Sequence, residues 1–375
     1  MRYWLEEGVD GFRMDAVPFL FEDERLRDEE LVGDLSAKST SEEYPDRYHT
    51  QNLPESVEMV QQWRELVDQY TARDNRTRLM VTEAYAKVDK TFQYYGTEDR
   101  PGAHFTFNFF LIQMLDRSSG AAAFNRTINT WLQNLPEGRW SNWVMGNHDN
   151  GRVASRFPGL ADALSALVLW LPGTAVTYYG DELAMEDAPI SYQDTIDPLG
   201  CAAGPQGYLS QSRDPARTPF QWDDSASAGF SSSEATWLPV HPNHRQLNLA
   251  RQRQSDDSHY RVYTKLVAER RARTLQRGSA TVDALSDNVL AFVRELAGED
   301  TYCVVINMGN SSETVDLTAA FRNIPSRLSI VVASVGSSFA RGRVVSSTEI
   351  TLAEKEFVGL KSSSELCDKS MPLLV

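Results

Sequence analysis

Carboxylate side chains end three short apolar segments of the chain. The segments finish at Asp15, Glu83 and Asp149, with Arg13 two positions before the first and His148 next to the third. Residues two apart on a strand point to the same face, so the charge of Arg13 is expected to keep Asp15 ionised. Burial after an apolar run would favour the protonated form of Glu83. The expected chemistry is proton transfer by a protonated carboxyl beside ionised carboxylates.

Each of these groups also has a purely structural interpretation. Arg13 and Asp15 can form an ion pair, Glu83 can lie near a helix N-terminus, and His148 can be a loop histidine with internal partners. In a β/α barrel, however, catalytic side chains converge at the C-terminal ends of the strands. Three carboxylates in such positions therefore favour the catalytic interpretation.

The elements that position these groups alternate between strands and helices over the first two-thirds of the chain. Between the strands, apolar residues recur every three or four positions, as in 56–70, which predicts helices. This alternation indicates a parallel sheet with helices packed outside it. The expected strands are 11–15, 78–83, 104–108, 143–146 and 175–179.

The rest of the chain changes character twice. Residues 181–245 are rich in Pro, Gly, Ser, Asp and Trp, and they are expected to form a long ordered loop. A helix is predicted over 258–276, with an arginine cluster at a solvated C-terminal end. From residue 280 on, short apolar runs separated by turn residues predict a small antiparallel sandwich. These runs are 289–293, 302–306 and 328–332.

The net charge of the chain argues against some classes of binding partner. The chain has 37 Lys and Arg against 52 Asp and Glu, a net charge of −15, which repels phosphate backbones and anionic headgroups. We expect no nucleic acid partner, and no run reaches the ~18 apolar residues of a membrane span. The N-terminus shows no signal peptide. Three sequons that accept glycans in a secretory compartment begin at Asn75, Asn125 and Asn310.

The three cysteines are too few and too widely spaced for a disulfide framework or a CxxC zinc site, which leaves room for one pair and a free thiol. They are Cys201, Cys303 and Cys367.

Taken in order, the three segments resemble the signature regions of the α-amylase superfamily of glycoside hydrolases. Those regions read G-x-R-x-D, a strand-ending Glu, and N-H-D. The stretch SRDPARTPFQW at 212–222 resembles the α-glucosidase branch, and TIDPLGC at 195–201 is similar to animal, particularly insect, maltases. The resemblance runs from Met1 to about Gly278 and, more loosely, into the sandwich.

The resemblance implies catalytic roles for three acids. Asp15 would be the nucleophile, Glu83 the general acid/base and Asp149 the stabiliser of a retaining α-glucosidase that works by double displacement. Ala16 resembles the small residue of α-1,4-cleaving members. The expected substrates are maltose, sucrose or short α-1,4-oligosaccharides, and no cofactor is expected.

The resemblance also implies three substrate-binding residues. Arg13 would hold the nucleophile ionised, His148 would donate a hydrogen bond to a sugar hydroxyl, and Arg217 would help close the pocket around the non-reducing glucose. For the full-length parent it implies a secreted or extracellular location.

The implied fold is α/β. Residues 1–279 would form an incomplete (β/α)8 TIM-type barrel holding strands 4 to 8, and residues 280–375 a C-terminal antiparallel β-sandwich. The family's first three strands, its insertion domain and its D-x-x-x-N-H signature have no counterpart in the sequence. We therefore expect an N-terminally truncated chain.

Two other classes of function stay open. One is a non-catalytic relative used for binding, as in the heavy subunits of amino-acid transporters, although all three acids are retained here. The other is a metal-dependent hydrolase built on His148, Asp149, His241 and His244, but no H-E-x-x-H or comparable motif accompanies them. No metal site is predicted.

Overall fold

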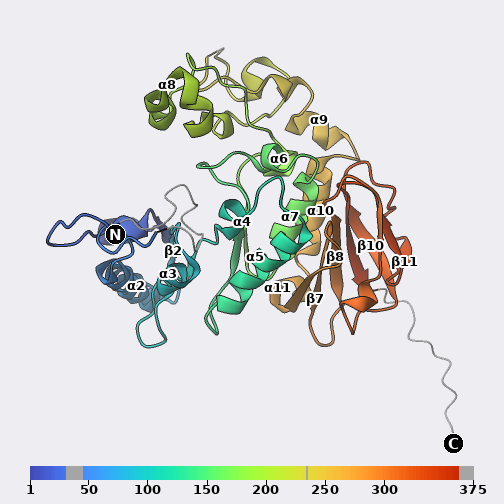
Figure 1. The fold of residues 1–375 in the computed structure, drawn as a ribbon, viewed down its shortest axis with the longest axis horizontal. Coiled ribbons are helices and arrows are strands. Elements are labelled where there is room, and N and C mark those ends of the chain that lie inside the picture. The colour runs from blue at the N-terminus through green and yellow to red at the C-terminus, as the bar shows by residue number, and fades with distance from the viewer. Residues whose placement is uncertain (31–44, 234, 363–375) are drawn as a thin grey trace, which may run out of the picture. The chain divides into compact units, whose positions relative to one another are not determined.

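The computed structural model describes residues 1–30, 45–233 and 235–362. These residues form two compact units. Unit 1 comprises Met1–Leu115 and Thr127–Val144. Unit 2 comprises Asp116–Arg126 and the described chain from Met145 onward. Figure 1 shows the elements of both units, coloured along the chain. Cys367 lies outside the described residues.

Unit 1 is built around a parallel sheet of three strands, as predicted from the first three β-rich runs. In register, Arg13 of the first strand faces Val81 of the second, and Thr82 faces Thr106 of the third. The strands, in this spatial order, are β1 (Gly11–Met14), β2 (Leu79–Thr82) and β3 (Phe105–Thr106). A fourth strand of unit 1, β4 (Asn142–Val144), matches the fourth predicted run.

The helix predicted over 56–70 is α2 (Pro54–Asp74). Proline at its first turn fits because the missing N–H would have no partner there, and Asn75 ends it in the left-handed region at φ 59°. Its buried residues Val60 and Val67 pack in one hydrophobic cluster with Met80 of β2. The remaining helices of unit 1 are α1 (Arg2–Glu6), η1 (Val17–Phe19), α3 (Val88–Gln93), α4 (Phe110–Gln113) and the larger part of α5 (Ala121–Asn134).

Unit 2 contains the fifth predicted strand, β5 (Thr174–Val176), and a series of helices. The expectation of a long ordered loop over 181–245 is only partly right, because α8 forms inside it. Asp197 starts α8 by accepting a hydrogen bond from the Leu199 amide, and Gly204 kinks it at φ 69°. The α-helices of unit 2 are α6 (Val153–Arg156), α7 (Ala161–Trp170), α8 (Pro198–Gln211), α9 (Leu249–Gln254), α10 (His259–Glu269) and α11 (Arg273–Arg277). The 3-10 turns are η2 (Asp181–Leu183), η3 (Asp214–Ala216), η4 (Ala226–Gly229), η5 (Pro242–Arg245) and η6 (Leu317–Ala319).

The helix predicted over 258–276 is interrupted between α10 and α11, and its arginine cluster is not entirely solvated. Arg270 turns inward and donates to the carbonyls of Leu169 and Gly173, at and just beyond the C-terminal end of α7. A cation there meets the negative end of the helix dipole as well as carbonyls that have no partner within the helix.

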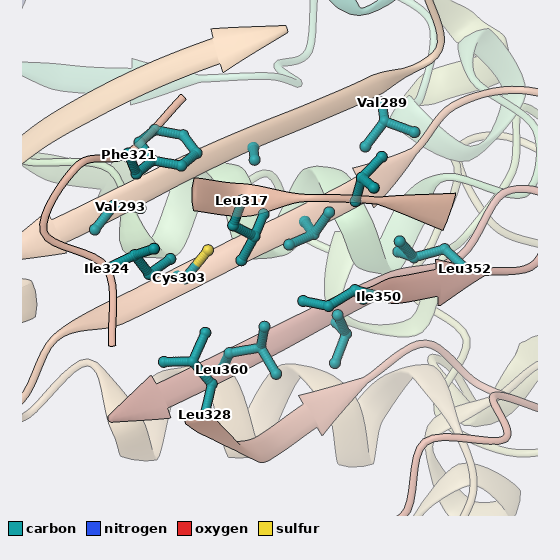
Figure 2. Packing of buried hydrophobic residues seen from close by; sticks show 14 of the residues in the cluster. Val289, Val293, Cys303, Leu317, Phe321, Ile324, Leu328, Ile350, Leu352 and Leu360 are labelled. Carbon is teal, nitrogen blue, oxygen red and sulfur yellow. The ribbon is translucent and has the colours of Figure 1, made fainter. Parts of the chain in front are cut away.

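The C-terminal region is antiparallel, as predicted. A six-stranded sheet runs in the order β11-β10-β13-β8-β7-β6, and β12 and β9 form a separate pair. Buried side chains from the large sheet, such as Val293 and Cys303, pack with Leu317 and Ile350 in one core (Figure 2). The strands are β6 (Ser279–Ala284), β7 (Val289–Glu295), β8 (Tyr302–Asn307), β9 (Glu313–Val315), β10 (Arg327–Ala333), β11 (Val344–Ser346), β12 (Ile350–Leu352) and β13 (Phe357–Ser362).

None of the helices within the described ranges combines the length and the apolarity needed to cross a lipid bilayer.

Arg294 of β7 is a fully buried cation that joins the C-terminal sheet to α7 and α11. Its guanidinium donates to the carbonyls of Trp170, Thr274, Gly278 and Ser279. Burial lowers the pKa of Arg294 to about 10, yet the side chain stays charged at neutral pH. One buried side chain therefore donates to four backbone carbonyls in the junction between the sheet and the two helices.

We expect Arg294→Met to destabilise the protein by about 3 kcal/mol, because the carbonyls lose their donors in a buried site. Urea unfolding followed by fluorescence measures the change. The matched control is Arg327→Met, an exposed arginine of β10 in the same sheet, which should shift stability by less than about 0.5 kcal/mol. Equal effects of the two substitutions would contradict the role given to Arg294.

A second polar contact links α7 and α10 to the segment after β10, through His259 and Asp162. Its Nδ1 lies 2.7 Å from Oδ1 of Asp162 in α7, and Oδ2 of Asp162 accepts from the Val335 amide at 3.0 Å. Burial opposes protonation of the imidazole, but the hydrogen bond and charge of Asp162, helped by Asp257, outweigh it and raise the pKa of His259.

A raised histidine pKa stabilises the fold at low pH. The contribution is complete below the ordinary value near 6.5 and is lost as pH rises through the raised pKa. We therefore expect His259→Gln to reduce the free energy of unfolding more at pH 5.5 than at pH 8.5, as measured by urea titration at both values. In an Asp162→Asn background, which lacks the carboxylate partner, His259→Gln should show a much smaller trend. A pH-independent loss for His259→Gln would contradict the assignment.

Candidate active site

The first part of the candidate site lies at the ends of β1 and β2 in unit 1. The parallel register pairs Met14 with Thr82, so Asp15 and Glu83 follow at the same level of the sheet. The Glu83 amide donates to the Met14 carbonyl at 2.8 Å, which fixes the two strand ends to each other. The two carboxylates are therefore carried by adjacent strands at one edge.

Arg13 joins these two carboxylates. Its Nη1 lies 2.7 Å from Oδ1 of Asp15, and its Nη2 donates to Oε2 of Glu83. The expected contact between Arg13 and Asp15 is present, but the second contact was not foreseen from the sequence. One guanidinium thus holds both acids by its two terminal nitrogens.

The environments of the two acids differ. The Asp15 side chain is 71% exposed, whereas that of Glu83 is 8% exposed. The Glu83 carboxylate is buried, as expected after an apolar run, and its contact partner there is the Arg13 guanidinium. The Asp15 carboxylate is therefore exposed to solvent, whereas the Glu83 carboxylate is buried beside it.

Ala16 takes an unusual backbone conformation directly after Asp15. Its φ is 48°, in the left-handed region, and the chain turns there into η1. An alanine costs roughly 1 kcal/mol in this region, and a bulkier or β-branched residue costs more. The left-handed backbone at this turn therefore favours a small residue after Asp15. This explanation is separate from the α-1,4 specificity that the resemblance suggests for the position.

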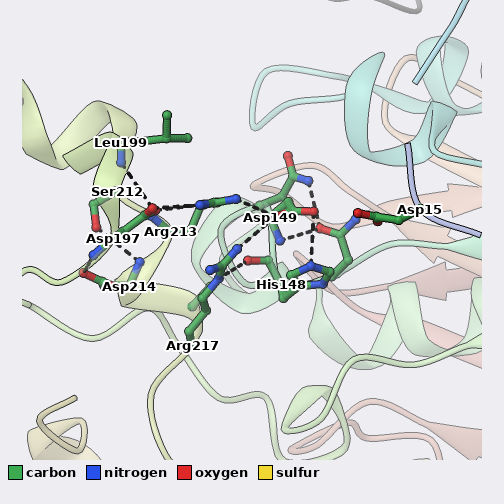
Figure 3. Close-up of polar contacts among 12 residues, drawn as sticks. Asp15, His148, Asp149, Asp197, Leu199, Ser212, Arg213, Asp214 and Arg217 are labelled. Carbon is green, nitrogen blue, oxygen red and sulfur yellow. Dashed lines mark hydrogen bonds and ion pairs between the residues drawn. The ribbon is translucent and has the colours of Figure 1, made fainter. Parts of the chain in front are cut away.

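The second part of the candidate site is centred on Asp149 in unit 2. Arg213 Nη1 and Arg217 Nη2 lie 3.1 and 2.9 Å from its Oδ1, and His148 Nε2 lies 3.4 Å from its Oδ2 (Figure 3). Arg217 also donates from Nε to the His148 carbonyl at 2.7 Å. The structure therefore brings together three residues that the resemblance marks as site residues, His148, Asp149 and Arg217.

Arg213 is a site residue that sequence reasoning missed. Asp197 binds it through both carboxylate oxygens, with Nε and Nη2 each at 2.8 Å, and it also accepts the Arg213 amide (Figure 3). The Arg213 hydrogen bond holds the pKa of Asp197 well below its usual range, and the pKa of Arg213 is raised in turn. The available signal was the SRDPAR string, in which an arginine precedes Arg217 by four positions.

A further arginine closes the base of the loop that carries Asp149. Arg156 donates to the carbonyls of Met145 and Gly151, which stand at the two ends of the loop. Inside the loop, Asn147 Oδ1 accepts the Asp149 amide at 3.0 Å. The backbone under Asp149 is therefore fixed from both ends and from within.

A fully buried arginine, Arg152, lies next to this loop in the sequence. Arg152 is fully buried and donates to the Tyr179 carbonyl at 2.7 Å, while its own amide donates to Asp187 at 2.8 Å. Burial raises the pKa of the neighbouring Asp181 to about 7, although the charge of Arg152 acts against this rise. Nothing in the spacing of the sequence indicated this network.

The residues considered for a metal are engaged in local structure. His241 Nδ1 accepts the Asn243 amide at 3.0 Å and caps η5, and His244 Nδ1 lies 3.0 Å from the His241 carbonyl. In the part of the chain that the structure describes, no group of three His, Cys, Asp or Glu side chains is placed to hold an ion.

Comparison with known proteins adds the family. The family model described as alpha amylase, catalytic domain, matches residues 1–278. Maltase 1 of Drosophila virilis is 46% identical over 359 residues, which is 94% of this chain and 56% of that protein. A salivary alpha-glucosidase of Anopheles gambiae is 42% identical over 86% of this chain and 55% of its own length. The chain thus spans little more than half of these relatives.

Solved structures of this family have the same fold as this chain. The trehalulose synthase MutB from Pseudomonas mesoacidophila MX-45 is 27% identical, with a TM-score of 0.77 over 96% of this chain and 66% of that one. The parallel strands and the C-terminal antiparallel sheet are therefore those of the alpha-amylase barrel fold. Together, the sequence match over residues 1–278 and the likeness to these relatives show that the chain belongs to the alpha-amylase catalytic-domain family.

Proposed function

We propose that the chain is the catalytic part of a retaining α-glucosidase. The observation that carries the proposal is the pair of carboxylates, Asp15 and Glu83, held by one guanidinium at the ends of adjacent parallel strands. Retaining glycosidases need two carboxyl groups at close range, one to attack and one to transfer a proton. The retention of all three family acids favours this activity over a binding role.

In the first step, the exposed Asp15 carboxylate attacks the anomeric carbon while Glu83 gives its proton to the departing glycosidic oxygen. The bond between that carbon and oxygen breaks, and a glucosyl ester forms on Asp15. Arg13 favours the charged form of Asp15 that is needed for attack.

In the second step, Glu83 takes a proton from water, and the resulting oxygen attacks the same carbon and releases Asp15. Two inversions leave the configuration unchanged. Asp149 is the third acid of this reaction, and Arg213 and Arg217 hold its carboxylate in place.

The proposed substrates are maltose, sucrose and short α-1,4-oligosaccharides cleaved at the non-reducing glucose. His148 donates to a hydroxyl of that glucose, and Arg217 closes the pocket around it. The names of the similar proteins, maltase and alpha-glucosidase, support this substrate class. The proposed chemistry needs no cofactor.

The proposed location of the full-length parent is extracellular. A similar protein is named a salivary alpha-glucosidase, and the sequon residues Asn75 and Asn310 are exposed, as a glycan acceptor must be.

The two catalytic acids can be told apart with an aryl α-glucoside whose leaving group needs little protonation. In the full-length parent, we expect Asp15→Asn to lose at least about 10³-fold in kcat, because nothing replaces the nucleophile. Glu83→Gln should keep rapid glycosylation of this substrate but lose activity on maltose. Rapid mixing that records the aryl alcohol burst distinguishes the two variants.

Asp10→Asn is the matched control, since Asp10 lies five positions earlier and pairs with Arg76 on the surface. Its activity should equal that of the unmodified protein. Equal, residual hydrolysis of the aryl glucoside by the unmodified protein and by Asp15→Asn would exclude the enzymatic proposal and favour a binding relative. Full activity of Asp15→Asn would exclude Asp15 as the nucleophile.

Arg156 holds the loop that carries Asp149 by its hydrogen bonds to the Met145 and Gly151 carbonyls. We expect it to affect the rate, although it does not contact the substrate. We expect Arg156→Lys to lower kcat by about 10- to 100-fold with little change in KM, because a single Nζ cannot take the places of both Nε and Nη2, and Asp149 shifts. Arg117→Lys is the control, since Arg117 makes one hydrogen bond to the Ser155 carbonyl. Steady-state kinetics on maltose tests this, and an unchanged kcat at unchanged melting temperature would refute it.

A further inference from the structure

The backbone on both sides of Arg217 is held by two adjacent tyrosines of unit 2. The Tyr178 hydroxyl donates to the Ala216 carbonyl at 3.2 Å. The Tyr179 hydroxyl donates to the Thr218 carbonyl at 2.7 Å. The tyrosines lie just after β5, 38 and 39 positions before their acceptors. Each contact therefore links the end of β5 to the segment that carries Arg217.

The other polar groups of Arg217 are also engaged. The indole nitrogen of Trp237 donates to the Arg217 carbonyl at 2.9 Å. The Arg217 amide donates to the Asp214 carbonyl at 2.9 Å, at the end of η3. The guanidinium donates to the His148 carbonyl at 2.7 Å and to Asp149 at 2.9 Å. The side chain thus reaches Asp149 from a backbone that is fixed at three successive carbonyls.

The rings of the two tyrosines are held in turn by the buried Arg152. Its guanidinium carbon lies 5.1 Å from the ring centroid of Tyr178 and 4.8 Å from that of Tyr179. Arg152 Nη1 donates to the Tyr179 carbonyl at 2.7 Å, whereas Nε and Nη2 have no hydrogen-bond acceptor among the described residues. The attraction between a desolvated guanidinium and two aromatic faces therefore helps to fix both rings.

Arg152 and Asp149 belong to one short segment, because only Asn150 and Gly151 separate them. Arg152 contacts the tyrosines, the tyrosines bind the backbone around Arg217, and Arg217 binds Asp149. The contacts form a closed series that begins and ends in the same segment. The ion pair between Arg217 and Asp149 is therefore supported from both of its partners.

We propose that Tyr178 and Tyr179 are positioning residues, whose hydroxyls set the Arg217 guanidinium against Asp149 and against the non-reducing glucose of the substrate. An arginine side chain has many rotamers, so its guanidinium reaches a defined place only when the backbone beneath it is fixed. The tyrosines act through Arg217 rather than by touching the substrate. This inference rests on the proposed function, because that proposal places Arg217 in the glucose pocket.

Removal of one hydroxyl in the full-length parent tests the inference. We expect Tyr179→Phe to raise KM for maltose about tenfold, as loss of a hydrogen bond that places a binding group requires. Its kcat should change by less than about threefold, because Arg213 still holds Asp149. Tyr178→Phe should act in the same direction but more weakly, since its hydrogen bond is longer.

Tyr263→Phe is the matched control. The Tyr263 hydroxyl lies 2.8 Å from the Thr177 hydroxyl, so the substitution removes a tyrosine hydrogen bond one position away from Tyr178. That bond does not reach the segment of Arg217, and KM should stay within about twofold of the unmodified value. Equal increases in KM for Tyr263→Phe and Tyr179→Phe would overturn the inference.

A double-mutant cycle shows whether Tyr179 acts through Arg217. In an Arg217→Ala background, Tyr179→Phe should change kcat/KM for maltose by less than about twofold, because the side chain that it positions is gone. The same tenfold loss in both backgrounds would overturn the inference, since it would reveal a structural effect that does not pass through Arg217.

A crystal structure of the parent with Tyr178→Phe and Tyr179→Phe separates this inference from the proposed function. We expect Arg217 Nη2 to lie beyond about 4 Å from the Asp149 carboxylate, the limit of an ion pair. An unchanged ion pair would overturn the inference. A displaced Arg217 with unchanged kinetics on maltose would support it and would refute the place of Arg217 in the glucose pocket. If the double variant does not fold, Tyr179→Phe alone gives the same reading, because this side chain is 38% exposed.

Discussion

The candidate site depends on one arginine that two parallel strands share. Arg13 points from β1 to both Asp15 and Glu83, and it can do so only because the register sets the two strand ends level. A one-residue slip would send alternate side chains to the other face and break both contacts. The register of the sheet therefore determines the electrostatic contacts of both acids.

Arginine serves the same purpose elsewhere in the molecule. Arg213 and Arg217 fix the third acid, Arg156 holds the loop below it, and Arg270 and Arg294 cap the end of α7. A planar guanidinium presents several donors in fixed directions, so it can bridge two acceptors in a way that lysine cannot. The chain is strongly acidic overall, yet its buried and half-buried cations hold the candidate catalytic carboxylates in place.

Arg13 contacts two acids, Asp15 and Glu83, whose proposed roles require opposite protonation states. Asp15 is open to solvent and needs charge, while Glu83 is buried and must carry a proton during part of the proposed cycle. Arg13 favours the charged form of both, and burial favours the neutral form only for Glu83. The difference in burial, more than the shared arginine, separates their roles.

The sequence by itself determined the local elements and the type of chemistry. Period-two and period-3.6 patterns located β1, β2 and α2, and the strand-ending acids were visible because hydrophobic runs stop at them. The tertiary structure alone decided the contacts between distant segments. Arg13 reaches Glu83 across 70 positions and Arg213 reaches Asp149 across 64. Such contacts depend on register and loop path, which local periodicity does not encode.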